Sequence, residues 1–204
     1  MDDHAVVRQG LKQILASEFR HAHFGEAGNT RDAVSLVWKE PWDVVVLDIT
    51  MPGRSGLDVL EECKRTRARM PVLVLSMHPE DQFAMRVLKL GAAGYMTKES
   101  APEELVGAVK KVMAGGRYVS PFLGERMASF LDTDVQRAPH EHLSTREFLV
   151  LRQLAAGRTV SEIARELALS VKTISTYRTR LLEKMHMKST AELMHYAIAN
   201  ELVK

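Results

Sequence analysis

Hydrophobic and polar positions follow two alternating patterns along the first two-thirds of the chain. Apolar residues recur at helical spacing at Val7, Leu11, Ile14 and Leu15, and a short strand is predicted near 23–27. Further elements are predicted in this order: a helix around 33–38, a strand at 44–48, a helix at 56–67, a strand at 71–76, a helix at 81–90, a strand at 94–96 and a helix at 102–113. Nearly continuous apolar strands separated by helices are typical of a parallel, doubly wound α/β sheet.

The last third of the chain is predicted to be entirely helical. Ser144-Thr145-Arg146-Glu147 has the pattern of a capping box and begins a helix that Gly157 ends. The following elements are a helix at 161–167, a turn at 168–170, a longer helix at 171–185 and a last helix that begins with a second capping box at 189–192. Two helices joined by a tight turn indicate a helix-turn-helix domain.

These patterns divide the 204 residues into two domains and a linker. The α/β domain covers 1–116, and an all-α helix-turn-helix domain covers 142–204. Residues 117–141 form the linker, with a predicted helix at 121–131 and a polar hinge at 132–141.

Charge is distributed unevenly between these parts. Residues 142–204 carry 10 Lys and Arg residues against 6 Asp and Glu residues, whereas 1–116 carry 15 against 16. A basic third on an otherwise neutral chain predicts that a polyanion binds there.

Composition also indicates the cellular compartment in which the protein is expected. The single cysteine, Cys63, excludes an intramolecular disulfide and fits a reducing cytoplasm. No apolar stretch approaches the roughly 20 residues of a membrane-spanning helix, and the N-terminus lacks a signal-peptide pattern. A cytoplasmic protein without a membrane partner is therefore expected.

Polar groups follow successive apolar runs at the point where each predicted strand ends. Asp48 and Ser76 close two of these runs, Lys98 follows a third, and Asp2-Asp3 lie at the front of the chain. The carboxyl ends of parallel strands meet at one sheet edge, where ligands of open α/β sheets bind. A carboxylate that faces an acidic pair, a hydroxyl and an ammonium group has the chemistry of a phosphorylatable aspartate.

The residues that carry this chemistry resemble the receiver domain of two-component response regulators. The matching motifs are Asp2-Asp3-His4, Asp48-Ile49-Thr50-Met51-Pro52-Gly53-Arg54-Ser55-Gly56, Ser76, Gly91-Ala92-Ala93-Gly94-Tyr95 and Lys98. The resemblance implies that Asp48 accepts a phosphoryl group from a sensor histidine kinase. It also implies a bound Mg²⁺ or Mn²⁺, held by Asp2, Asp3, Asp48 and the backbone carbonyl of Thr50.

The resemblance assigns roles to three further side chains. Lys98 pairs with one phosphoryl oxygen, and Ser76 donates a hydrogen bond to another. Tyr95 matches the aromatic residue that follows Ser76 inward on activation. Glu99 stands where the family often has proline after the lysine, so no cis Lys-Pro bond is expected.

One element of the receiver pattern is not found. A receiver needs a central apolar strand directly before its acidic pair, and only Met1 precedes Asp2. Without that strand, the sheet would have a gap and unpaired strand edges. A truncated N-terminus, a misassigned start and a perturbed domain are the alternatives, and the first two are favoured.

The helical domain resembles the LuxR-type DNA-binding domain. The matching segments are Leu143-Ser144-Thr145-Arg146-Glu147, Ile163-Ala164, Ser170-Val171-Lys172-Thr173-Ile174 and Lys184-Met185. Together, the two resemblances identify a response regulator of the NarL/FixJ type, controlled by phosphorylation. Promoter DNA and a second copy of the chain are the implied partners, and RNA polymerase is a further candidate.

The predicted recognition helix has two distinct faces at 100° per residue. The buried face should contain Val171, Ile174, Leu181, Leu182 and Met185, and the outward face Lys172, Thr176, Thr179, Arg180 and Glu183, with Ser175 at its edge. By resemblance, Ser175, Thr176 and Thr179 read bases, while Lys172, Tyr177, Arg178 and Arg180 lean toward phosphates.

The last helix is predicted to contribute to dimerisation. Its broad apolar face contains Leu193, Met194, Ala197, Ile198 and Leu202, and core packing would account for Leu193 and Ile198. In the unphosphorylated state the receiver would mask this surface, and phosphorylation would release it.

Two alternatives to this function are open. An aspartyl-phosphate enzyme of the haloacid dehalogenase type needs a second carboxylate two residues after the nucleophile, and Thr50 stands there. The other alternative is a DNA-binding protein whose receiver acts as an interaction module without phosphorylation. Asp48, Ser76 and Lys98 argue against it, whereas the missing first strand argues for it.

Overall fold

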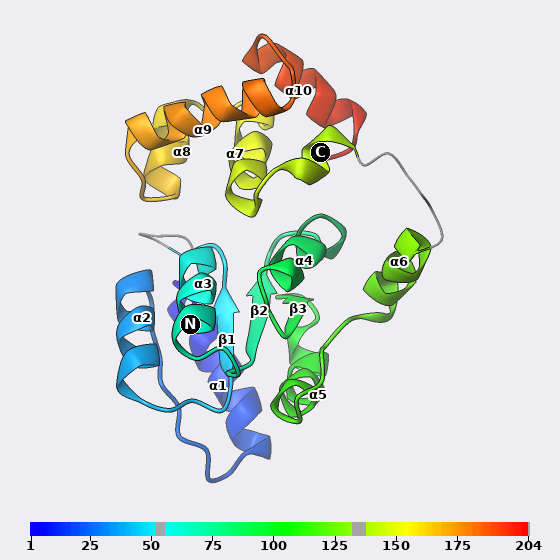
Figure 1. The fold of residues 1–204 in the computed structure, drawn as a ribbon. Coiled ribbons are helices and arrows are strands. Elements are labelled where there is room, and N and C mark those ends of the chain that lie inside the picture. Colours follow the sequence, from blue (N-terminus) through cyan, green and yellow to red (C-terminus); the bar gives the residue numbers. More distant parts are fainter. Residues whose placement is uncertain (52–55, 132–137, 204) are drawn as a thin grey trace. The chain divides into compact units, whose positions relative to one another are not determined.

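Three parallel strands organise the first of two units in the chain (Figure 1). The computed structural model describes residues 1–51, 56–131 and 138–203. Strands β1 (Val45–Asp48), β2 (Val72–Ser76) and β3 (Gly94–Thr97) form one sheet in the order β1-β2-β3. Asp48 pairs with Leu75, and Ser76 pairs with Thr97, so the carboxyl ends of the strands are aligned.

Helices alternate with these strands and cover the sheet. They are α1 (Ala5–Glu18), α2 (Thr30–Lys39), α3 (Gly56–Thr66), α4 (Glu80–Lys89) and α5 (Ala101–Met113). Helix α1 packs on α5, and α2 packs on α3. Every residue of β2 is buried, as expected for a strand whose two faces are both covered. The predicted parallel α/β class is confirmed.

The prediction of a strand near 23–27 is wrong, because these residues adopt no strand in the structure. The N–H of Asp2 donates to the carbonyl of Ala27 at 3.1 Å, and this contact lies at the end of the segment. A strand is defined by its pairing with a neighbour. In the described residues, the bond from Asp2 is the backbone contact that 23–27 makes with a neighbouring segment, and one bond does not form a ladder.

The predicted linker helix is present as α6 (Pro121–Leu131), which packs against α4 within the first unit. Tyr118 forms an isolated parallel bridge with Gly94, and Leu123 is buried. The hydroxyl of Ser120 donates to Glu80 at 2.7 Å. Most of the predicted hinge, 132–137, lies outside the described residues.

The second unit contains the predicted helix-turn-helix. Its helices are α7 (Thr145–Ala155), α8 (Val160–Glu166), α9 (Val171–Lys184) and α10 (Thr190–Ala199), after a short 3-10 helix at Pro139–His142. Helix α7 packs against α9 and α10, and α8 packs against α9. Capping boxes begin α7, as predicted, and also α8, where Thr159 and Glu162 form one. The side chain of Ser189 caps α10.

The side chain of Glu147 connects α7 to the recognition helix α9 through a salt bridge with Lys184. Its carboxylate accepts hydrogen bonds from the N–H and hydroxyl of Ser144 and from Nζ of Lys184, at 2.8, 2.9 and 2.8 Å. Burial alone would raise the pKa of Glu147, but the bonds from Lys184 and Ser144 outweigh it and lower that pKa. The ionised form therefore stabilises the fold.

Glu147→Ala is expected to lower the free energy of unfolding by about 2 kcal/mol at pH 7, because it removes a buried, charge-assisted cap. The stabilisation is complete above the ordinary pKa of glutamate and is lost as the pH falls through the lowered folded-state pKa. Denaturant unfolding at several pH values measures this. Glu162→Ala removes the same motif at an exposed site, so an equal loss in both variants would contradict the role of burial.

Candidate functional site

The sheet brings the predicted phosphoacceptor residues together at one edge. Asp48 ends β1, Ser76 ends β2, and Lys98 directly follows β3. The N–H of Lys98 donates to the carbonyl of Ser76 at 2.9 Å, which fixes the loop after β3 against β2. All peptide bonds in the described residues are trans, including the one between Lys98 and Glu99.

Lys98 bridges two buried carboxylates. Its Nζ lies 2.7 Å from Oδ2 of Asp48 and 2.7 Å from Oδ2 of Asp2. Asp48 is 2% exposed and Asp2 is 1% exposed. Burial raises the pKa of Asp48, against the opposing effects of hydrogen bonds from Lys98 and the N–H of Thr50. For Lys98, burial acts in the lowering direction, but its bonds to Asp2 and Asp48 raise the pKa, so the ammonium stays charged.

The acidic pair has the features of a cation site. Oδ1 of Asp3 lies 2.8 Å from Nδ1 of His4, and Oδ2 of Asp2 has its ion pair with Lys98, but neither oxygen has an aligned hydrogen bond. The ligand atoms of Asp2, Asp3 and His4 lie within 4.8 Å of one another. Hard oxygen ligands with unsatisfied lone pairs fit Mg²⁺ or Mn²⁺. The donor set therefore fits the predicted ion.

Backbone contacts position this acidic pair. The N–H of His4 donates to Oδ1 of Asp2 at 2.9 Å, and Nη1 of Arg8 donates to the carbonyl of Asp2 at 2.8 Å. Across the site, the N–H of Thr50 donates to Oδ1 of Asp48 at 2.9 Å. The next part of the matched motif, 52–55, lies outside the described residues.

Ser76 and Tyr95 both connect to the loop after β2. The hydroxyl oxygen of Ser76 accepts the N–H of His78 at 3.1 Å, and the hydroxyl of Tyr95 donates to the carbonyl of His78 at 2.7 Å. Both side chains are fully buried. Nε2 of His78 also lies 3.3 Å from the hydroxyl of Thr50, close to Asp48. Sequence reasoning missed His78, although its position two residues after a strand-end hydroxyl was an available signal.

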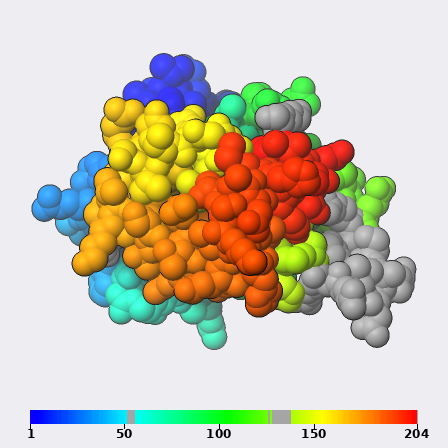
Figure 2. Space-filling view, turned by 90° about the horizontal axis from the view of Figure 1, so that it is seen from above, coloured from blue at the N-terminus to red at the C-terminus, as the bar shows by residue number. Residues whose placement is uncertain are grey.

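The recognition helix α9 presents the predicted polar face to solvent. Its exposed residues include Lys172, Ser175, Thr176, Thr179, Arg180 and Glu183. Ile174, Leu181 and Met185 are buried, as predicted. Val171 was predicted on the buried face and is instead 51% exposed, at the first position of the helix. Figure 2 shows the surface of α9 in orange beside α10 in red.

Three side chains on α9 form hydrogen bonds within the second unit. The hydroxyls of Thr176 and Thr179 donate to the helix carbonyls of Lys172 and Ser175, at 2.9 and 3.1 Å. Nε of Arg178 donates to the hydroxyl of Thr190 at 2.7 Å, and the side chains of Tyr177 and Arg178 are half-buried. Arg178 is thus anchored to the start of α10.

Two protein families match the two units. Residues 1–110 match the response regulator receiver domain, and 141–197 match the bacterial regulatory proteins of the luxR family. The chain is 35% identical over 203 residues to the response regulator UvrY of Escherichia coli (strain K12), covering 99% of this chain and 93% of that protein.

Solved structures of the response regulator RcsB are similar to nearly the whole chain. RcsB from Salmonella enterica serovar Typhimurium, bound to promoter rprA in the presence of the phosphomimetic BeF3⁻, has a TM-score of 0.67 and 27% identity. That comparison covers 96% of this chain and 94% of the other. A structure of two RcsB dimers bound to two parallel DNAs has a TM-score of 0.58 and 26% identity, with the same coverage of 96% and 94%. The chain therefore belongs to the two-component response regulators of the NarL/FixJ type, which join a receiver domain to a LuxR-type DNA-binding domain to regulate transcription.

Proposed function

We propose that Asp48 is the phosphoacceptor and that a sensor histidine kinase supplies the phosphoryl group. The single observation that carries this proposal is the bridge from Nζ of Lys98 to Asp48 and Asp2 at the aligned strand ends. A buried ammonium between two carboxylates places positive charge where phosphoryl oxygens would otherwise meet only negative charge. Asp2, Asp3, Asp48 and the carbonyl of Thr50 would hold Mg²⁺ or Mn²⁺, which would supply further neutralisation.

The transfer step uses three residues of the chain. An oxygen of Asp48 attacks phosphorus, the bond from phosphorus to the kinase histidine breaks, and the imidazole leaves with the electron pair of that bond. Lys98 contacts one oxygen of the transferred group. The hydroxyl oxygen of Ser76 already accepts the N–H of His78, so its proton is free to be donated to another phosphoryl oxygen. The product is an aspartyl phosphate.

A haloacid dehalogenase type of hydrolase is not supported by the site. Such an enzyme needs a general acid two residues after the nucleophile, and Thr50 offers only a hydroxyl there. That hydroxyl faces His78 at 3.3 Å. The chain is therefore a regulator whose receiver promotes its own phosphorylation and has no separate substrate.

Promoter DNA is the proposed ligand of the second unit. Lys172 and Arg180 are exposed on α9, as are Ser175, Thr176 and Thr179. In this proposal the two cations contact phosphates and the three hydroxyl residues contact base edges. Tyr177 and Arg178, at the side of the helix, are proposed to contact the phosphate backbone of the DNA. The DNA-bound RcsB structures support this assignment, because they cover the same two domains.

Dimerisation through α10 is the proposed arrangement on DNA. Leu193, Ala197 and Leu202 are buried in the domain core, and Met194 is half-buried. Ile198 was expected to be explained by core packing, but it is 63% exposed. An exposed isoleucine beside a half-buried methionine leaves an apolar surface for a second copy. Two domains joined there would place their recognition helices on paired half-sites.

Ile198→Asp is expected to abolish cooperative filling of two half-sites while one domain still binds one half-site. A carboxylate at the centre of a small apolar interface would be desolvated without a partner. Sedimentation of the chain on palindromic and single half-site duplexes measures both properties. Glu201→Gln changes a charge near the same helix end without adding one, and it should leave cooperativity intact. Unchanged cooperativity in Ile198→Asp would remove α10 from the interface.

Phosphorylation is proposed to control access to this surface, with the polar linker 132–141 connecting the domains. A bias of a few kcal/mol between two states is sufficient for such a switch. Bound dimers could then present their receivers to RNA polymerase.

Phosphotransfer from acetyl phosphate, with and without Mg²⁺, tests the proposed function. We expect acid-labile phosphate on the chain only with the metal present, together with tighter binding to a palindromic duplex. Tight DNA binding without any phosphate incorporation would instead favour a receiver that acts as an interaction module without phosphorylation.

A further inference from the structure

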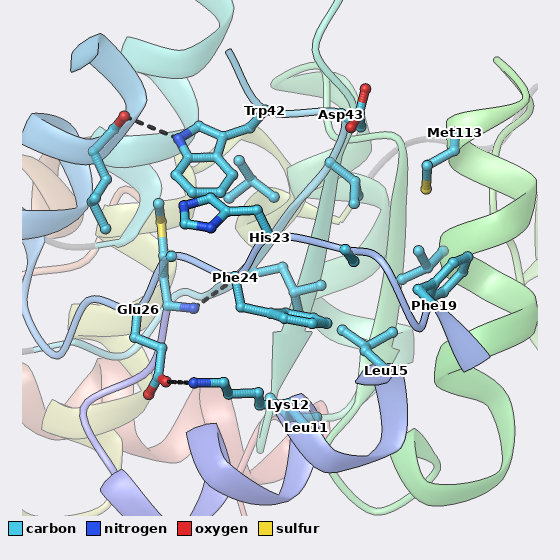
Figure 3. A pocket seen from close by; sticks show the side chains of 18 of the residues that line it. Leu11, Lys12, Leu15, Phe19, His23, Phe24, Glu26, Trp42, Asp43 and Met113 are labelled. Atoms are coloured by element: carbon cyan, nitrogen blue, oxygen red, sulfur yellow. Dashed lines mark hydrogen bonds and ion pairs between the residues drawn. The ribbon is translucent and has the colours of Figure 1, made fainter. Parts of the chain in front are cut away.

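The two edges of the sheet in the first unit are covered differently. Beside β1 lies a cavity of about 450 Å³, whose wall includes Leu15 and Phe24 (Figure 3). At the other edge, the segment that follows α5 covers β3. Tyr118 forms a parallel bridge with Gly94, and its N–H donates to the carbonyl of Ala93 at 2.9 Å. The start of the linker is therefore attached to the sheet of the first unit.

The linker is also attached to α4, through Ser120. The hydroxyl of Ser120 donates to Oε2 of Glu80, the first residue of α4, at 2.7 Å. The same hydroxyl oxygen accepts the N–H of Leu123 at 3.1 Å, within the first turn of α6, and Leu123 is buried. Ser120 thus joins the first turn of the linker helix to the first turn of α4.

The start of α4 is in turn attached to the phosphoacceptor site. Glu80 stands four residues after Ser76, and His78 lies between them. The N–H of His78 donates to the hydroxyl oxygen of Ser76, and its carbonyl accepts the hydroxyl of Tyr95. The ring of His78 stacks on Phe83 of α4, with ring centroids 4.5 Å apart. A displacement of Ser76 or Tyr95 would therefore move His78 and the first turn of α4 together.

Glu80 is a weak point in this series of contacts. Its Oε1 is buried without a hydrogen bond, so one of its two carboxylate oxygens is unsatisfied. Burial raises the pKa of Glu80, the hydrogen bond from Ser120 opposes this effect, and the negative charge of Glu104 on α5 adds to it. A desolvated, half-satisfied carboxylate is unfavourable, so a small displacement of α4 is sufficient to break the bond with Ser120.

We propose that Ser120, through its bond with Glu80, is the positioning residue that transmits phosphorylation of Asp48 to the linker helix α6. In the unphosphorylated chain this bond holds α6 on α4, and the docked linker restrains the second unit from dimerising on DNA. When Ser76 moves to a phosphoryl oxygen, His78 follows, the bond from Ser120 to Glu80 breaks, and the first turn of α6 leaves α4. This inference rests on the proposed function, because it needs a phosphoryl group at Asp48.

Such a coupling must act in both directions. If phosphorylation weakens the docking of α6, a chain that cannot dock α6 must favour the phosphorylated arrangement of the loop after β2. Loss of the bond should therefore strengthen DNA binding without phosphate. It should also strengthen the binding of the phosphomimetic BeF3⁻, which is an equilibrium measurement.

Five variants of the full chain test the coupling. Ser120→Ala removes the donor, Glu80→Ala removes the acceptor, and a double variant removes both. Glu80→Gln keeps an oxygen that accepts the Ser120 hydroxyl. Ser17→Ala is the matched control, because the Ser17 hydroxyl also makes a local hydrogen bond, to the carbonyl of Ile14, at an exposed position of α1. Binding to a palindromic duplex is measured with and without BeF3⁻ and Mg²⁺, and fluorine NMR reports bound BeF3⁻.

The two alanine variants are expected to bind the duplex about fivefold more tightly than wild type without BeF3⁻, and to gain correspondingly less when it is added. They should also bind BeF3⁻ about fivefold more tightly. The double variant should equal each single variant, because both remove the same bond. Glu80→Gln and Ser17→Ala should behave as wild type.

Amide hydrogen exchange of the wild-type chain tests the coupling without any substitution. BeF3⁻ and Mg²⁺ should lower the protection of the Leu123 amide at least about tenfold, while that of Leu105 in the core of the same unit stays unchanged. Unchanged protection of Leu123 in a chain that has bound BeF3⁻ would overturn the proposal.

Two results with the variants would also overturn it. One is duplex binding by Ser120→Ala that matches Ser17→Ala both with and without BeF3⁻. The other is additive effects of Glu80→Ala and Ser120→Ala, which would show that the two residues act separately. Acetyl phosphate labelling is measured in parallel. A chain that is labelled but fails these tests contradicts this inference alone, whereas a chain that takes up neither phosphate nor BeF3⁻ contradicts the proposed function and this inference with it.

Discussion

Asp48→Asn is expected to abolish acid-labile phosphate incorporation from acetyl phosphate in the presence of Mg²⁺. The amide cannot attack phosphorus, and Asp48 is the carboxylate that ends β1 within 2.7 Å of Nζ of Lys98. Asparagine keeps the size of the side chain and an oxygen that can accept the Lys98 bond. The fold should therefore survive, which circular dichroism and the Tm check directly.

Asp43→Asn is the matched control for this variant. Asp43 lies five residues earlier on the same segment and is exposed, so its loss should leave labelling unchanged. Wild-type labelling of Asp48→Asn would show that another group receives the phosphate and would remove the phosphoacceptor assignment. Lys98→Ala should keep Asp48 in place yet slow labelling, because the ammonium that neutralises the phosphoryl oxygens is gone.

The strand-end site was predictable because parallel strands place their carboxyl ends at one edge. Asp48, Ser76 and Lys98 each follow an apolar run, and the register of β1, β2 and β3 aligns them. The bridge from Lys98 to Asp2 was harder to predict from the sequence. It depends on Met1 pairing with β1, a contact between residues 45 positions apart that no periodicity encodes.

The errors share a physical cause, which is that periodicity describes one element and burial depends on its neighbours. The pattern of 23–27 predicts a strand, yet a strand also needs a paired neighbour, and in the described residues this segment makes one such bond, with Asp2. Val171 is the first residue of α9 and is exposed. Ile198 is exposed although its neighbours Ala197 and Leu202 are buried, because it lies about 100° around the helix from Ala197 and faces away from the core.

Lys172→Ala and Arg180→Ala are expected to weaken binding to every duplex and to flatten its salt dependence. Both side chains are exposed on the same face of α9. Each lost phosphate contact should reduce the slope of log K against log salt by about 0.9. Binding isotherms at several salt concentrations, on a target and a random duplex, measure this slope. Glu183→Gln is the control on the same face, and removing its negative charge should strengthen binding to both duplexes.

Thr176→Ala and Thr179→Ala are expected to act on sequence preference instead. Their hydroxyl protons are directed to helix carbonyls, so each oxygen can only accept a hydrogen bond, and the amino groups of adenine and cytosine are the base-edge donors in the major groove. Losing one such contact should narrow the ratio of target to random binding by about fivefold, or about 1 kcal/mol. The salt slope should stay unchanged, because no phosphate contact is lost. If the lysine and arginine variants changed only sequence preference, or the threonine variants changed only the salt slope, the two roles would be exchanged on this helix.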